Sequence, residues 1–156
     1  MNKKKFVVLI AFVILLGLIQ FIRPERNQQT NPSRYDIFHK TETEVTIVTT
    51  FQTSCYNCHS NRTVYPWYAS VAPVSWIINN HVNEGKEHLN FSDWILYDKE
   101  KQIKKLMDIA EVLQEHEMPP KPYLWLHDEA KISDADRQLL LKWVEEKKEQ
   151  VRYSLN

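Results

Sequence analysis

The sequence predicts an all-α fold. Its 156 residues include only two glycines against seven prolines, which favours helices joined by stiff, irregular loops over a sheet with tight hairpin turns. Three segments after residue 70 also repeat apolar residues at the spacing of one helical face. About 120 residues follow the N-terminal apolar and polar stretches, enough for one compact domain with its own core.

The N-terminus has the pattern of a membrane helix. Three lysines at 3–5 precede an apolar run over residues 6–19, which Phe21 and Ile22 extend. About 17 helical residues span roughly 25 Å, close to the lower limit for crossing a bilayer. No Ala-x-Ala-like site follows, and no cysteine lies near the run, so we expect an uncleaved single-pass anchor rather than a signal peptide or lipoprotein. The lysines predict a cytoplasmic N-terminus.

These patterns predict three parts in the chain. Residues 1–26 form the anchor, the polar residues 27–34 form a linker, and residues 35–156 form the folded domain. The chain carries 20 basic and 20 acidic residues, so its charge gives no reason to expect a nucleic-acid partner.

Four helices are expected in the domain. Residues 44–51 are rich in β-branched side chains, so a strand is possible, but we interpret them as the start of a helix. The next helix follows Pro73 and stops at Gly85. A third covers about Asp98 to Glu117, and a fourth begins at Ser133 as N-cap. The apolar faces of the last three are Val74, Ile77, Ile78, His81 and Val82; Ile103, Leu106, Met107, Ala110 and Leu113; and Leu139, Leu140, Trp143 and Val144.

The most specific motif is Cys55-Tyr56-Asn57-Cys58-His59, which has the spacing of a c-type haem attachment site. Two thiols separated by one helical turn can each bond one haem vinyl group, and the following imidazole can bind iron as the proximal ligand. The motif therefore predicts one covalently bound haem c per chain.

Two other readings of the cysteines remain open but are weaker. A redox dithiol uses the same spacing, but it usually lies where a strand leads into a helix, and no such pattern is present. A structural zinc site needs four ligands, and the sequence has neither a second Cys pair nor a His pair at zinc-finger spacing.

An aromatic segment follows the motif. Tyr65, Trp67 and Tyr68 lie in a stretch without helical periodicity. They could cap the core as an ordinary loop, or they could wall the porphyrin while Arg62 contacts a propionate. The sequence leaves both roles open.

Two residues are candidates for the sixth iron ligand. Met118 precedes a double proline that can hold an extended loop, and methionine opposite histidine is the electron-transfer arrangement. His81 is the polar residue on an otherwise apolar helix face, where it could aim at the haem or serve as a core histidine. We favour Met118 as the metal ligand with His59, and an open site stays an alternative.

Further residues extend the pattern beyond the motif. They are Ser60, Asn61, Tyr65, Pro66, Trp67, Tyr68, Pro73, Val74, Ser75, Trp76, His81, Val82, Gly85, Leu89, Asn90, Phe91, Ser92, Trp94, Met118, Pro119, Pro120, Tyr123, His127, Ala130, Ser133 and Trp143. With the motif, they make the chain resemble the small bacterial haem-binding domain family of cytochrome c-like proteins. The resemblance implies a cytochrome c-like helical domain wrapped around one haem, anchored to the membrane and facing the periplasm. It implies no defined reaction. Lys86 stands where we would expect arginine, which affects only a propionate or surface contact.

The predicted function is that of a single-haem electron carrier. It would be held in the inner (cytoplasmic) membrane by its N-terminal helix, with the haem domain on the periplasmic side, and would serve redox partner proteins that the sequence does not identify. The alternatives are a haem-based sensor and a peroxidase-type enzyme with an open iron face beside His81. No other catalytic set is apparent, so an enzyme is the less expected outcome.

Overall fold

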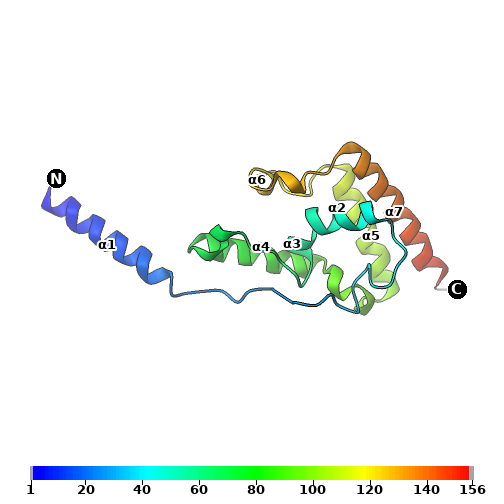
Figure 1. The fold of residues 1–156 in the computed structure, drawn as a ribbon, viewed down its shortest axis with the longest axis horizontal. Coiled ribbons are helices and arrows are strands. Elements are labelled where there is room, and N and C mark those ends of the chain that lie inside the picture. Colours follow the sequence, from blue (N-terminus) through cyan, green and yellow to red (C-terminus); the bar gives the residue numbers. More distant parts are fainter. Residues whose placement is uncertain (1, 155–156) are drawn as a thin grey trace.

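The computed structural model describes residues 2–154 and is helical, with no strand among the described residues. This agrees with the all-α expectation. A single isolated bridge pairs Gln28 with Arg62. The elements are α1 Lys3–Ile19, α2 Val45–Ser54, α3 Tyr56–His59, η1 Trp67–Ser70, α4 Val74–His88, η2 Phe91–Leu96, α5 Lys99–Gln114, α6 Lys121–Leu124, η3 Asp128–Ala130 and α7 Asp134–Tyr153, where η marks a 3₁₀ helix. Figure 1 shows α5 and α7 side by side, with α2 crossing them and α3 leading away to α4.

The core lies between α5, α7 and α2. Its aliphatic part comes from the buried faces of α5 and α7, and its aromatic part from Phe51, Phe91 and Trp143. Phe51 packs its ring edge-on against both Phe91, at 5.5 Å between centroids, and Trp143, at 5.2 Å. Such pairs stabilise a core beyond their buried area, so α2, which leads into the cysteine motif, is fixed by the same cluster that joins α5 to α7.

Local signals set the starts of the two long helices. The Asp98 side chain accepts a hydrogen bond from the Lys101 N–H at 2.7 Å, and Ser133 Oγ accepts one from the Asp136 N–H at 3.1 Å. Both caps satisfy a backbone donor that has no partner within its helix. The predicted N-cap at Ser133 is confirmed. On the apolar face of α5, Ile109 is buried, whereas the predicted Met107 is 54 % exposed.

Within the segment 44–51, residues 45–51 are helical, as interpreted, and belong to α2, with Glu44 as its N-cap. Gly85, in contrast, does not stop its helix. It lies inside α4, which continues to His88. The glycine is needed for a close approach rather than for a cap, as its surroundings below show.

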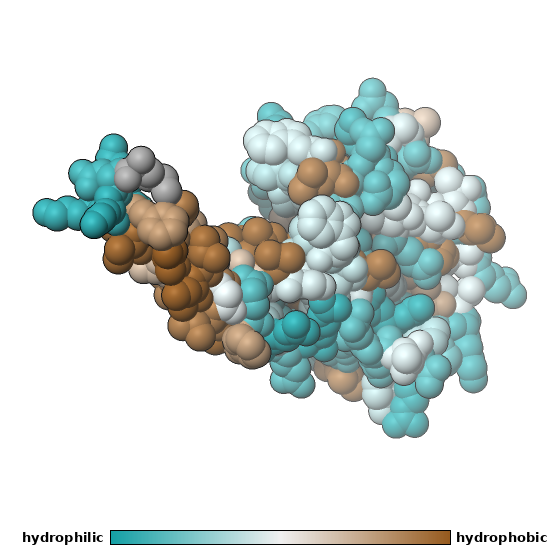
Figure 2. Space-filling view, turned by 60° about the vertical axis from the view of Figure 1, so that its left-hand side comes forward, coloured by the Kyte–Doolittle hydropathy of each residue, from teal (hydrophilic) through white to brown (hydrophobic). Residues whose placement is uncertain are grey.

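The predicted transmembrane helix is wrong, and so is the single-pass inner-membrane location that rested on it. Within residues 2–154, no helix combines the length and the apolar character required to span a bilayer. The apolar part of α1 stops at Ile19, so at about 1.5 Å per residue it rises roughly 21 Å against a hydrocarbon core of about 30 Å. Phe21 and Ile22 lie beyond the helix, after its C-cap Gln20. Figure 2 shows α1 as an apolar arm that extends from the domain.

The chain after α1 stays in contact with the domain. The Gln20 amide donates to the Ala72 carbonyl at 3.1 Å and accepts from the Ala72 N–H at 2.9 Å. The Trp76 indole N–H donates to the Ile22 carbonyl at 2.8 Å. These bonds set the direction in which α1 leaves the domain. The limits 1–26, 27–34 and 35–156 stay a prediction.

Candidate functional site

The cysteine motif lies at the junction of α2 and α3. Cys55 separates the two helices, and the N–H groups of Cys58 and His59 both donate to its carbonyl, at 3.2 and 3.0 Å. This single turn orders all three side chains of the motif. Both thiols are free and partly buried. Burial raises the pKa of Cys55 to about 12, with a smaller contribution from Cys58, and it also raises the pKa of Cys58. The thiols are therefore protonated at neutral pH.

The His59 imidazole is held by one of its two nitrogens. Nδ1 lies 2.8 Å from the Gly85 carbonyl oxygen and 3.1 Å from that of Leu89. Because both partners are acceptors, Nδ1 carries the hydrogen, and Nε2 is left with its lone pair. Burial lowers the pKa of His59 more than the two carbonyls raise it, so the ring is neutral. A neutral histidine whose Nδ1–H donates to a backbone carbonyl is the usual form of a metal-binding imidazole.

Gly85 brings α4 against the motif. A Cβ added at this position would lie 2.7 Å from the Cys58 carbonyl oxygen and 3.2 Å from Cys58 Cβ. The first distance is shorter than real Cβ contacts allow, and the atom it meets belongs to the backbone. Only glycine lets α4 come close enough for its own carbonyl to reach His59 Nδ1.

Gly85→Ala is expected to destabilise the protein. Alanine favours a helix by about 1 kcal/mol over glycine, but the Cβ forces α4 away from Cys58, and overpacking of this kind costs about 1–3 kcal/mol. The clash dominates because a backbone carbonyl cannot rotate aside, and we expect a net loss of up to about 2 kcal/mol. The midpoint of denaturant unfolding measures it.

Gly17→Ala is the matched control, because a Cβ at Gly17 would meet nothing within 4 Å. Because Gly17 lies inside α1, where alanine favours the helix, this change is expected to keep stability or raise it by up to about 1 kcal/mol. Equal midpoints for Gly85→Ala and the unmodified protein would contradict the role assigned to Gly85.

A second set of polar contacts holds the chain just after His59. Asn27 Nδ2 donates to the Ser60 carbonyl at 2.7 Å and to Thr63 Oγ1 at 2.8 Å, while its Oδ1 accepts from Lys86 Nζ at 2.7 Å. Ser60 is fully buried and donates to the Tyr56 carbonyl. The sequence predicts only a polar linker at Asn27, because nothing local marks it as a partner of residues more than 30 positions away.

The other predicted site residues lie on other segments of the chain. Tyr65 accepts a hydrogen bond from the Asn27 N–H at 3.1 Å and lies under the Arg26 guanidinium. Trp67 is 81 % exposed on η1, His81 is exposed on α4, and Met118 is partly exposed in the loop before α6. Within the described residues, no hydrogen bond or ring contact joins these four to His59.

Sequence reasoning did not predict the contacts that join a group of residues next to the motif. Asn57, between the cysteines, donates to the Tyr123 hydroxyl at 2.9 Å. Tyr123 stacks on His127, whose Nε2 lies 2.7 Å from the Tyr68 hydroxyl. The charged neighbours of His127 indicate a surface residue, yet its side chain is only 12 % exposed. The resemblance includes His127, but only the fold shows the partners that its side chain contacts.

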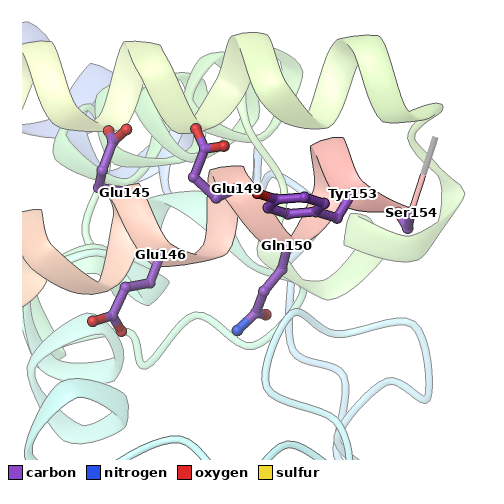
Figure 3. Close-up of a pocket in the computed structure, with 6 residues that line it drawn as sticks. All are labelled: Glu145, Glu146, Glu149, Gln150, Tyr153 and Ser154. Atoms are coloured by element: carbon purple, nitrogen blue, oxygen red, sulfur yellow. The ribbon is translucent and has the colours of Figure 1, made fainter. Parts of the chain in front are cut away.

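Two hollows lie away from the motif. An open one of about 690 Å³ runs along the last turns of α7, where Glu145, Glu146, Glu149, Gln150, Tyr153 and Ser154 line it (Figure 3). Its acidic side chains include Glu145 and Glu149, which pair with Lys148 and Arg152. Another, of about 450 Å³, separates the Gln20–Arg26 segment from η1 and α4. Neither contains a cysteine or His59.

The donor set fits haem better than the alternatives. Within residues 2–154, there is no cluster of three or more His, Cys, Asp or Glu side chains that could hold a metal ion. The structural zinc site therefore lacks its ligands. A haem needs only the two free thiols and one neutral imidazole with an available Nε2.

The comparisons point to the same cofactor. The model of the haem-binding domain family matches residues 14–146. No curated protein and no solved structure shows significant similarity to the chain. The match covers most of the chain and includes the whole cysteine motif, so the chain belongs to the haem-binding domain family.

Proposed function

We propose that this haem protein carries one covalently attached haem c and acts as a single-haem electron carrier. Cys55 and Cys58 would hold the group as thioethers, His59 would bind iron from the proximal side, and Met118 would bind it from the other side. The observation that carries this proposal is the His59 ring, which is neutral and fixed through Nδ1. When bound, the haem supplies a one-electron iron couple.

Residues of the chain would set the reduction potential of that iron couple. The Gly85 and Leu89 carbonyls accept from Nδ1–H and so increase the basicity of Nε2. A thioether ligand from Met118 favours ferrous iron and raises the reduction potential. Trp67 and His81 have exposed side chains and are proposed to line the cofactor together with Tyr65. Redox partner proteins would meet the protein at this side.

An absorption spectrum of the purified, reduced protein tests the proposal. We expect a c-type spectrum that carbon monoxide changes only slowly, because His59 and Met118 would both bind the iron. A spectrum that shifts at once with carbon monoxide would contradict the carrier assignment.

An open sixth position would instead indicate a ligand-binding sensor or a peroxidase-type enzyme. The observation in favour of that second candidate is His81, whose imidazole is exposed on the same helix that contacts His59. An exposed imidazole can exchange protons with a bound ligand. Peroxide turnover that His81→Ala removes would support this candidate.

A further inference from the structure

Met118 lies in a connection that departs from the helical core. Residues 115–133 join α5 to α7, and Figure 1 shows this connection running out from the helix pair and back, with α6 near its far end. At its base, the buried Arg137 donates to the Leu113 carbonyl at 2.7 Å. That bond secures the start of the connection but not its outer part. Next to Met118, the Glu117 N–H donates to the Val112 carbonyl at 3.0 Å, which holds the chain before Met118 to α5. The chain after Met118 depends on contacts that α6 and the following residues make elsewhere.

The first such contact reaches the cysteine motif itself. Asn57 Nδ2 donates to the Tyr123 hydroxyl at 2.9 Å, and Asn57 Oδ1 accepts from the Val64 N–H at 3.0 Å. Because Oδ1 accepts from Val64, the amide nitrogen of Asn57 is the end that faces Tyr123. α6 is thus attached to the residue between the two cysteines.

The second contact passes through His127. Its ring stacks on Tyr123 with centroids 4.1 Å apart and planes 15° apart. Nδ1 lies 2.9 Å from Glu129 Oε1, and Nε2 lies 2.7 Å from the Tyr68 hydroxyl. The bond from His127 lowers the pKa of Glu129, so the carboxylate accepts from Nδ1–H, and Nε2 in turn accepts from the Tyr68 O–H. Tyr68 belongs to η1, so the loop is attached to a second element.

The chain between Met118 and Tyr123 is stiff. Three of the four intervening residues are proline, at positions 119, 120 and 122. Proline fixes one backbone dihedral of each residue and restricts the residue before it. The backbone can therefore absorb less of a displacement of Tyr123 before Met118 moves.

We infer that Tyr123 and His127 are positioning residues that hold Met118 at the sixth iron position by fastening α6 to Asn57 and Tyr68. This inference rests on the proposed function, because it requires haem at the motif and Met118 as ligand. We call Tyr123, His127 and Tyr68 the clasp. Loosening the clasp leaves Met118 chemically intact, but it raises the fraction of molecules in which no protein ligand occupies the sixth iron position.

Two conservative variants test the clasp from different elements. Tyr123→Phe removes the hydroxyl that Asn57 contacts and keeps the stacked ring, whereas Tyr68→Phe removes the hydroxyl that donates to His127. Each is expected to increase the rate of carbon monoxide binding to the reduced protein about fivefold, the change that loss of one ordinary hydrogen bond produces in an equilibrium. The double variant is expected to exceed either one and to weaken the near-red charge-transfer band of the oxidised protein.

Tyr35→Phe is the matched control, because its hydroxyl contacts only the exposed Arg34 among the described residues. It is expected to bind carbon monoxide as slowly as the unmodified protein. Because Tyr68 and Tyr123 lie on separate elements, one variant remains informative should the other fail to fold.

The outcomes separate the clasp from the proposed function. A charge-transfer band in the unmodified protein, with carbon monoxide rates unchanged in both variants, overturns the clasp and leaves Met118 as ligand. Absence of the band in the unmodified protein, with rapid carbon monoxide binding, overturns Met118 ligation itself and the clasp with it.

Discussion

Replacing Cys55 and Cys58 together with alanine is expected to abolish covalent haem attachment completely. These are the only cysteines of the chain, and a methyl group cannot form a thioether. Haem-linked peroxidase staining after denaturing electrophoresis measures the result, with protein from a strain that has c-type maturation machinery. The unmodified chain is expected to stain, and the double variant is not.

Ser54→Ala is the control for this variant, since it removes a single heavy atom from the residue next to Cys55. It is expected to keep full staining. The single variants Cys55→Ala and Cys58→Ala would each keep one thioether and stain more weakly. The double variant can still bind haem through His59, but acidified organic solvent would then extract it. Staining that survives in the double variant would refute covalent attachment through these thiols.

Met118→Ala is expected to remove the near-red charge-transfer band of the oxidised protein, because that band requires an iron–sulfur bond. It is also expected to let carbon monoxide bind the reduced iron rapidly. The reduction potential should fall on the order of 0.1 V, a modest part of the ~0.8 V that axial ligands span. Absorption spectroscopy and a redox titration measure these effects.

Met118→His separates the loss of a ligand from a change of ligand. It is expected to keep six-coordinate iron and still lower the potential, since imidazole favours ferric iron more than a thioether does. Met107→Ala is the matched control, because Met107 is exposed on α5. It should leave the band and the potential unchanged, as should His81→Ala. A band that persists in Met118→Ala would exclude Met118 as the ligand.

The sequence alone determined the features that depend on neighbouring residues. The cysteine motif needs only a five-residue spacing, and the starts of α5 and α7 need only Asp98 and Ser133 with the N–H groups three positions on. Helical periodicity likewise predicted that α4, α5 and α7 are helices, but its apolar faces were only partly correct. Of the expected α4 face, Val74, Ile77 and His81 are exposed and Val82 is buried, and on α7 Leu139 is exposed. In each case the physical signal lies within one or two turns of the chain.

Tertiary structure decided the features that depend on distant contacts. In the sequence, Gly85 could either end its helix or allow another segment to pack closely against it. Only the short distance to Cys58 shows that it does the second. The apolar run at the N-terminus continues past Ile19 in sequence, whereas the helix ends there and Gln20 bonds to Ala72.

The contacts of His127 depend on such distant partners too. It is near charged residues in sequence, yet it contacts Tyr68, 59 positions away. A hydrogen bond between residues so far apart leaves no local pattern, because loop closure and packing, and not helix geometry, bring its partners together. The motif and its helices could thus be predicted from sequence, whereas the groups that fix His59 and hold the Met118 loop required the fold.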